Sequence, residues 1–192
     1  MIECEKKILL NEQEYTFLKK FLQPFDSEHV QNNHYYDTLD LKMNQCGITC
    51  RIREKKGIYS VEIKQHSSDW QDISIENTES TYHEYNDEFF LNMGLIKHGF
   101  IKTYRCTLRK GDLEIALDKN DYLDFTDYEL EVEYPAQFED QAVAIVLYIA
   151  EALYSVALID RREDFIQRVG ICNNKSRRFF ERKQSTKTIK AD

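Results

Sequence analysis

The sequence predicts a mainly β domain of the α+β class, built from antiparallel strands. Charged and apolar residues alternate with period two in many short segments between positions 30 and 134. Short turns containing glycine or serine separate these segments, and such connections favour hairpins. Seven or eight strands of this kind can form either a sandwich or a closed barrel, and the alternation alone leaves both architectures open.

The individual elements follow from local patterns in chain order. A strand is expected at 2–9, and Asn11 followed by Glu14 resembles a capping box that begins a helix over about 12–22. Further strands are expected at 30–37, 47–54, 58–65, 69–76, 100–109, 112–119 and 128–134. Helices are expected over 81–93 and over 139–154, where the helical spacing of apolar residues is strongest, and a helical turn is expected within 162–169.

The length and composition predict one domain, residues 1–183, followed by a disordered polar tail, residues 184–192. The chain has 192 residues with two prolines and six glycines, and no stretch before the Lys/Ser/Thr-rich end resembles a linker. The formal net charge of -8 disfavours nucleic acid as a partner, so any bound anion needs a local basic patch. The longest apolar run, residues 142–150, is too short to span a bilayer, and we expect no membrane association.

The cysteines indicate a cytoplasmic protein. The five cysteines are scattered and odd in number, and no secretory signal accompanies them, which favours a reducing compartment. Cys46 and Cys50 are also half of a possible zinc site, but a thiolate site needs four converging ligands. We therefore interpret them as ordinary thiols.

Acidic residues share one face in three of the expected strands. Glu3, Glu5 and Lys7 lie at alternate positions, as do Glu129, Glu131 and Glu133, and Glu114 and Asp118 share a face of the preceding strand. One interpretation is an ordinary solvated strand face. However, three like charges along one strand repel one another, and convergent carboxylates are the ligands that Mg²⁺ and Mn²⁺ prefer. The pattern therefore favours a divalent metal site.

Basic residues follow the same alternation. Arg51 and Arg53 alternate with apolar neighbours, Glu62 and Lys64 do so in the next strand, and Arg105 and Arg109 share a face. An exposed sheet face with many salt bridges would show this pattern too. The alternative is a phosphate-binding wall, because guanidinium groups donate pairs of hydrogen bonds to phosphate oxygens.

An ordered set of motifs resembles the CYTH family, also called triphosphate tunnel metalloenzymes, which includes thiamine triphosphatases, inorganic tripolyphosphatases and class IV adenylate cyclases. The first motif, Glu3-Cys4-Glu5-Lys6-Lys7, fits the ExExK signature of the family. The others, in order, are Tyr35-Tyr36-Asp37-Thr38, Arg51-Ile52-Arg53, Glu62-Ile63-Lys64, Tyr104-Arg105, Leu117-Asp118, Glu129-Leu130-Glu131 and Lys175-Ser176-Arg177-Arg178-Phe179. The ExExK pattern alone is weak, whereas the ordered set spans nearly the whole chain.

The resemblance implies a closed antiparallel eight-stranded β-barrel that forms a tunnel, with helices packed outside. It implies Mg²⁺ or Mn²⁺ as cofactor, with the metal bound by Glu3, Glu5, Asp118, Glu129 and Glu131. It implies that a small triphosphate is bound by Lys7, Arg51, Arg53, Lys64, Arg105, Lys175 and Arg178. Within these sets the residues expected to act in catalysis are Glu3, Glu5, Lys7 and Arg53.

Three further residues need separate treatment. Glu133 shares its face with the expected metal ligands but lies beyond the matched motif, so it is a candidate only. Glu62 departs from the family pattern, which usually has an uncharged residue there, and its carboxylate could weaken phosphate binding or orient an arginine. Lys102 is out of phase with Arg105 and is expected outside the tunnel.

The function implied by the resemblance is metal-dependent hydrolysis of a phosphoanhydride in tripolyphosphate, thiamine triphosphate or a nucleoside triphosphate. One alternative is a class IV adenylate cyclase, but its additional His-Phe element has no room before Glu3. Another is a polyphosphate or nucleotide sensor without turnover, for which a full acidic set would be an electrostatic disadvantage. We expect a monomer or a homodimer.

Overall fold

The computed structural model describes residues 2–66 and 73–189. These residues form eight strands in one antiparallel sheet, and the fold is mainly β within the α+β class, as predicted. The strands are β1 (Ile2–Leu10), β2 (Ser27–Asp37), β3 (Ile48–Lys55), β4 (Ile58–His66), β5 (Ile73–Tyr82), β6 (Ile96–Lys110), β7 (Leu113–Tyr122) and β8 (Phe125–Tyr134).

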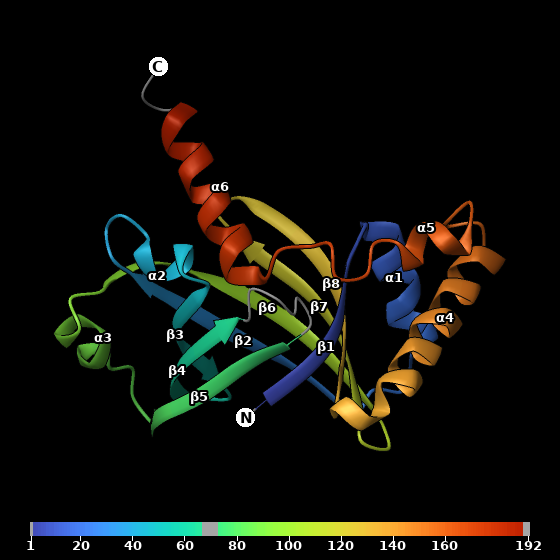
Figure 1. Ribbon diagram of the computed structural model, residues 1–192, viewed down its shortest axis with the longest axis horizontal. Helices are drawn as coiled ribbons and strands as arrows, with labels where there is room; N and C mark the ends of the chain where they lie inside the picture. Colours follow the sequence, from blue (N-terminus) through green and yellow to red (C-terminus); the bar gives the residue numbers. More distant parts are fainter. Residues whose placement is uncertain (1, 67–72, 190–192) are drawn as a thin grey trace.

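The strand order is β1-β5-β4-β3-β2-β6-β7-β8, and the strongly curved sheet is visible in Figure 1. β1 also pairs with β8, from Cys4 opposite Tyr134 to Leu10 opposite Tyr128, so that β1 lies between β8 and β5. Its register with β5 covers three residue pairs, from Ile2 opposite Ile75 to Cys4 opposite Ile73. The curvature gives the sheet a concave face, where the charged side chains of several strands converge.

The β3–β4 hairpin shows how a local sequence sets the register of that face. Lys56 and Gly57 connect the strands, and both have positive φ, 53° and 77°, as a type I′ turn requires. This turn places Lys55 opposite Ile58 and, farther along, Arg51 opposite Glu62. Arg51 therefore shares a face with a carboxylate on the neighbouring strand.

Helices pack on the outer face and at one end of the sheet. They are α1 (Glu12–Phe21), α2 (Lys42–Gln45), α3 (Glu88–Asn92), α4 (Glu139–Ser155), α5 (Arg162–Ile166) and α6 (Lys175–Ile189), with a 3-10 turn at Ala136–Phe138. α1, α4 and α5 gather beside β7 and β8, while α6 lies apart from them, on the side of α2 (Figure 1). None of the described helices is long and apolar enough to cross a membrane.

Two hydrophobic cores lie between helices and the outer face of the sheet. Leu117, Leu130 and Val132 belong to the core that includes Leu18 of α1 and Ile149 of α4. A second core joins Ile52 and Val61 of the β3–β4 hairpin to Tyr36 of β2 and Phe90 of α3. Because strand side chains alternate between faces, burying these apolar residues outward turns their charged neighbours toward the concave side.

Two local predictions agree with the structure. The Asn11–Glu14 capping box is present, with the Asn11 side chain accepting from Glu14 N and the Glu14 side chain accepting from Asn11 N. It begins α1 as the sequence indicated. The predicted helix over 139–154 is α4. The strand expected at 69–76 falls partly on 69–72, which lie outside the described residues, and β5 begins at Ile73.

Two predictions were wrong. The helix expected over 81–93 is reduced to α3, because β5 continues to Tyr82 and its last residues pair with Tyr59 and Ser60 of β4. The polar tail expected from residue 184 is helical as far as Ile189. There the Ser185 and Thr186 hydroxyls donate to the backbone carbonyls of Glu181 and Arg182 within α6, so these polar residues bond to the helix instead of interrupting it.

Candidate functional site

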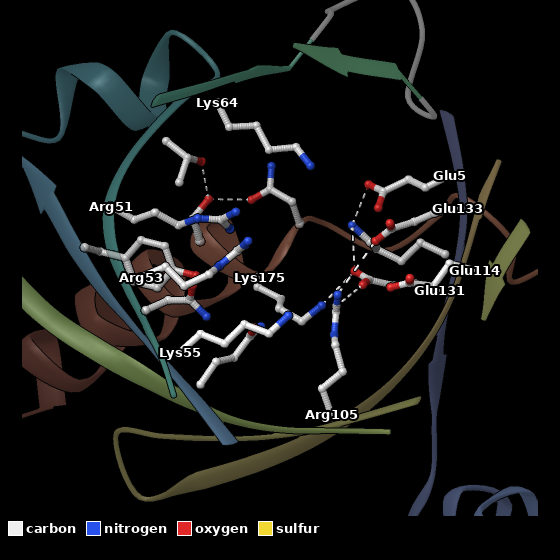
Figure 2. Close-up of a pocket in the computed structure, with 17 residues that line it drawn as sticks. Glu5, Arg51, Arg53, Lys55, Lys64, Arg105, Glu114, Glu131, Glu133 and Lys175 are labelled. Carbon is white, nitrogen blue, oxygen red and sulfur yellow. Dashed lines mark hydrogen bonds and ion pairs between the residues drawn. The ribbon is translucent and has the colours of Figure 1, made fainter. Parts of the chain in front are cut away.

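A charged cavity of about 210 Å³ lies on the concave face of the sheet. Its lining side chains come from seven strands and from the start of α6: Glu5, Lys7, Gln31, Asn33, Tyr35, Thr49, Arg51, Arg53, Lys55, Lys64, Arg105, Glu114, Glu131, Glu133, Asn174, Lys175 and Ser176. Figure 2 shows a basic side with Arg51, Arg53, Lys55 and Lys64 facing an acidic side with Glu5, Glu131 and Glu133. The charge separation suits a ligand that combines an anion with a metal cation.

Six of the seven residues predicted to bind a triphosphate line this cavity: Lys7, Arg51, Arg53, Lys64, Arg105 and Lys175. The seventh, Arg178, is not among the described lining residues. Its guanidinium instead contacts Asp127 and Glu129, with its Nε 2.9 Å from Asp127 Oδ2 and a terminal nitrogen 2.9 Å from Glu129 Oε2. In this arrangement Arg178 anchors α6 to β8 behind the cavity wall.

Four of the five predicted metal ligands lie, together with Glu133, in two groups of carboxylates that share Glu131. Oxygen atoms of Glu5, Glu131 and Glu133 lie within 4.8 Å of one another, and so do those of Asp118, Glu129 and Glu131. The first group lines the cavity, whereas Asp118 and Glu129 are fully buried behind it. The side chain of Glu3 lies outside the described part of the structure.

Lys175 joins α6 to the second acidic group. Its Nζ lies 3.0 Å from Asp118 Oδ2, 2.8 Å from Glu129 Oε2 and 2.7 Å from Glu131 Oε1. Burial alone would lower the pKa of Lys175, but the charges of Glu129 and Glu131 overcome it, and the pKa is raised. Lys175 is therefore protonated at neutral pH.

Two hydrogen bonds explain how α6 places Lys175 there. The Asn174 side chain accepts from the backbone N–H of Arg177 at 2.9 Å and caps the first turn of the helix. The hydroxyls of Ser176 and Thr49 are 2.7 Å apart, which ties this turn to β3. The first turn of α6 is therefore capped by Asn174 and tied to β3 through Ser176, with Lys175 between these two residues.

Arg105 and Lys7 interact with the same carboxylates. Arg105 lies opposite Asp118 in the β6–β7 register and donates two hydrogen bonds to it, at 2.9 and 2.7 Å, and it also bonds Glu131. Lys7 Nζ lies 2.8 Å from Glu5 Oε1 and 3.5 Å from Glu131 Oε1. Burial opposes the charge of Lys7, but Glu5 and Glu131 outweigh it and raise the pKa well above its ordinary value.

Two carboxylates of the acidic groups, Glu131 and Glu129, have lowered pKa values. Burial would raise the pKa of Glu131, yet the charges of Lys175 and Arg105 hold it well below its ordinary value. The pKa of Glu129 is lowered to about 2 because Lys175 and Arg178 outweigh the effect of burial. Both carboxylates therefore carry a negative charge at neutral pH.

Sequence reasoning missed several lining residues. Lys55 has the same parity as Arg51 and Arg53 and could have been found by extending their alternation by one step. Gln31, Asn33 and Tyr35 likewise alternate along β2. Asn174 and Ser176 belong to a turn and a helix start, where no strand period could indicate them. Lys102 lies with its Nζ 5.0 Å from the ring centroid of Tyr104 and is not among the described lining residues.

A second cavity of about 700 Å³ adjoins the first and shares Glu5, Lys7, Thr49 and Asn174 with it. Its other walls come from the end of α2, the segment before α6 and α6 itself. Amide side chains are frequent in this wall: Asn44, Gln45, Asn173, Asn174 and Gln184. The space next to the charged cavity is therefore polar, and its amides offer both donors and acceptors.

Comparison with known proteins confirms the family resemblance. Residues 1–156 match the model of the CYTH domain. The chain is 28% identical over 203 residues to "Putative triphosphatase YjbK" of Bacillus subtilis (strain 168), with 96% of this chain and 97% of the relative covered.

Two solved structures show the same fold. A protein from Bacillus halodurans described as a "putative adenylate cyclase" has a TM-score of 0.66 and 23% identity, with 93% of this chain and 97% of that chain covered. HpAC1 from Hippeastrum, described as a "putative adenylyl cyclase" with a dominant triphosphatase activity, has a TM-score of 0.56 and 18% identity, with 74% of this chain and 83% of that chain covered. Since the family model extends over most of the sequence, this chain belongs to the CYTH domain family.

Proposed function

We propose that this protein is a divalent-metal-dependent triphosphatase that hydrolyses a phosphoanhydride of a small triphosphate bound on the concave face of its sheet. The observation that carries the proposal is the division of one cavity into a basic side and an acidic side. A bare anion site would gain nothing from the carboxylates, whereas a complex of triphosphate and metal needs both. The names of YjbK and HpAC1 support the same activity.

The basic side suits a chain of phosphates. Arg51 and Arg53 can donate paired hydrogen bonds to phosphate oxygens, and Lys55 and Lys64 add point charges beside them. Lys7, Arg105 and Lys175 extend these contacts to the acidic side. In this role they orient the substrate and spread the negative charge that develops as the phosphoanhydride breaks. Arg178 would support them through α6.

The acidic side fits Mg²⁺ or Mn²⁺, because the donors are hard carboxylate oxygens and those within each of the two groups lie close enough to converge on an ion. We propose Glu3, Glu5, Asp118, Glu129 and Glu131 as ligands, with Glu133 as a further candidate because it shares a group with Glu5 and Glu131. When bound, such an ion neutralises phosphate charge and lowers the pKa of water. We further propose that the curved sheet acts as a closed tunnel around this site.

A substrate panel tests the proposal. Tripolyphosphate, thiamine triphosphate and ATP are each incubated with the purified protein in Mg²⁺ or Mn²⁺, and released phosphate is measured with and without excess EDTA. We expect metal-dependent phosphate release from at least one compound. Activity that survives chelation would exclude metal dependence, and formation of cyclic AMP with pyrophosphate from ATP would identify a cyclase. Binding of all three compounds without turnover would identify a sensor.

A further inference from the structure

Glu62 is a buried carboxylate on the basic side of the site. It lies on β4 directly opposite Arg51 of β3, and only 4% of the residue is exposed. Its Oε2 accepts a hydrogen bond from Arg51 Nε at 2.7 Å, and its Oε1 accepts one from the Ser60 hydroxyl at 2.5 Å. A carboxylate is costly to bury unless such partners surround it, so the contacts indicate a specific role.

The same carboxylate reaches the second arginine. Glu62 Oε2 lies 3.5 Å from a terminal nitrogen of Arg53, and Arg53 Nε donates to Asn33 Oδ1 at 3.1 Å. The Arg53 guanidinium is therefore held by β2 on one side and by β4 on the other. One oxygen of Glu62 contacts both arginines, and its negative charge reduces the repulsion between them.

Glu62 contacts the cavity-lining arginines but does not itself line the cavity. Arg51 and Arg53 line the cavity, whereas Glu62 is not among the described lining residues. Burial would raise the pKa of Glu62, but Arg51 and Arg53 lower it to about 2, so the group is charged at any ordinary assay pH. The carboxylate therefore contacts the two guanidinium groups from outside the lining of the cavity.

We propose that Glu62 is a positioning residue that holds Arg51 and Arg53 in the orientation in which both bind the phosphates of the substrate. Long arginine side chains lose rotamer freedom when they bind a ligand, and fixing them in advance reduces that entropic cost. The inference rests on the proposed triphosphatase function. It also explains how a carboxylate fits beside a phosphate-binding wall.

The first test replaces Glu62 by glutamine, which keeps the shape and an oxygen acceptor but removes the charge. kcat/KM is measured on the best substrate of the panel, and tripolyphosphate affinity is measured by calorimetry without metal. We expect both to fall on the order of tenfold. Glu62→Asp, which keeps the charge on a shorter side chain, should recover part of the loss. Circular dichroism and thermal unfolding establish that each variant is folded.

The matched control is Glu54→Gln. Glu54 is on the same hairpin and also accepts a hydrogen bond, from Asn32 Nδ2 at 2.9 Å, but it alternates with Arg53 and lies on the other face of β3. We expect its kcat/KM and tripolyphosphate affinity to stay within about twofold of wild type, because the basic wall is untouched. If Glu54→Gln and Glu62→Gln lowered kcat/KM and tripolyphosphate affinity equally, the proposal would be overturned.

A double-mutant cycle distinguishes positioning from general stabilisation. If Glu62 acts through the arginines, Glu62→Gln should cause a clearly smaller loss in an Arg51→Ala background and in an Arg53→Ala background than in wild type. Equal losses in all backgrounds, or no loss in wild type, would refute the role of Glu62. Failure of the wild-type protein to turn over any compound would refute the proposed triphosphatase activity. The double-mutant cycle measured as tripolyphosphate affinity by calorimetry would still decide the role of Glu62.

Discussion

The ring of Phe179 lies directly against the backbone of Gly99, so that a β-carbon on Gly99 would be 2.8 Å from Phe179 Cζ. Phe179 belongs to α6 and is fully buried among Tyr35, Ile101 and Tyr122, and Gly99 lies in β6 beside an irregularity of the β2–β6 pairing. This contact seats α6 on the sheet. The same helix begins with Lys175. The packing of the Phe179 ring therefore determines where the Lys175 ammonium lies within the acidic cluster.

Gly99→Ala should therefore displace α6 and disturb the site. The new methyl group would clash with Phe179, and φ at this position is +145°, a value that residues other than glycine rarely adopt. We expect a loss of about 1–3 kcal/mol in the free energy of unfolding together with reduced kcat/KM. Urea unfolding and turnover measure the two effects.

The control is Gly111→Ala, where φ is +61° but no atom lies within 4 Å of the added carbon. It imposes backbone strain without the clash, so it should lower stability by less and leave kcat/KM unchanged. Equal effects of the two substitutions would show that Phe179 packing does not position the site.

Arg53→Ala should lower kcat/KM by about tenfold or more, because a hydrogen bond from a guanidinium to phosphate contributes roughly 1.5 to 3 kcal/mol in a water-poor site. Arg53→Lys keeps the charge but loses the planar pair of donors, so only part of the activity should return. Lys102→Ala is the matched control, since Lys102 contacts Tyr104 and is not among the described lining residues. Small and equal effects of the two alanine substitutions would remove Arg53 from the substrate site.

Glu5→Gln should abolish turnover and leave the protein folded. The substitution removes the negative charge of a proposed metal ligand without changing the shape of the side chain. Glu5 lies 2.8 Å from Lys7 and is 12% exposed at its side chain. Glu139→Gln is a suitable control, since Glu139 forms an ion pair of the same length, 2.8 Å, with Lys6 and has a side chain that is 59% exposed. Turnover is measured across a range of Mg²⁺ concentrations with circular dichroism in parallel. Near-normal rates for Glu5→Gln at millimolar Mg²⁺ would exclude it from the metal site.

Stability should decline steeply in acid. The folded pKa of Glu129 is about 2, because Lys175 and Arg178 outweigh burial, and an unfolded glutamate has a pKa of about 4.3. A depressed folded pKa contributes stability that is fully present above about pH 4.3 and is lost as the pH falls through about 2, on the order of 3 kcal/mol for this group. Urea unfolding at pH 7, 4.5 and 3 should show the loss beginning below pH 4.5.

Glu129→Gln provides the comparison, because glutamine does not titrate. The variant should be less stable than wild type at pH 7, since Lys175 and Arg178 lose a buried partner. Its stability should then fall less steeply between pH 4.5 and 3. Parallel pH profiles for the two proteins would show that Glu129 contributes nothing to the acid sensitivity.

Patterns local to a strand or helix were sufficient to predict much of the fold. Strand geometry sends alternate side chains to opposite faces, so the sequence alone placed Arg51 with Arg53 and Glu129 with Glu131 on common faces. The Asn11–Glu14 capping box likewise predicted the start of α1. These features depend on neighbours a few residues away, and local stereochemistry determines them.

The tertiary structure decided which of these faces meet. The helix expected over 81–93 gave way to a longer β5 because β4 offers hydrogen-bond partners to Ser80 and Thr81, a competition that a local pattern cannot reveal. The contact of Glu62 with both arginines also required the pairing of β3 with β4 and the shape of the turn between them.

Lys175 is the clearest example of a contact that the tertiary structure decided. In the sequence it is one of several basic residues in the polar C-terminal part of the chain. It reaches Asp118, Glu129 and Glu131 only because Phe179 packs into a hydrophobic core formed by distant strands. The sequence by itself determined which residues carry charge and which face of a strand they occupy. Long-range packing of apolar side chains decided which charges lie within bonding distance, because the energy of burying those side chains depends on contacts far apart in the chain.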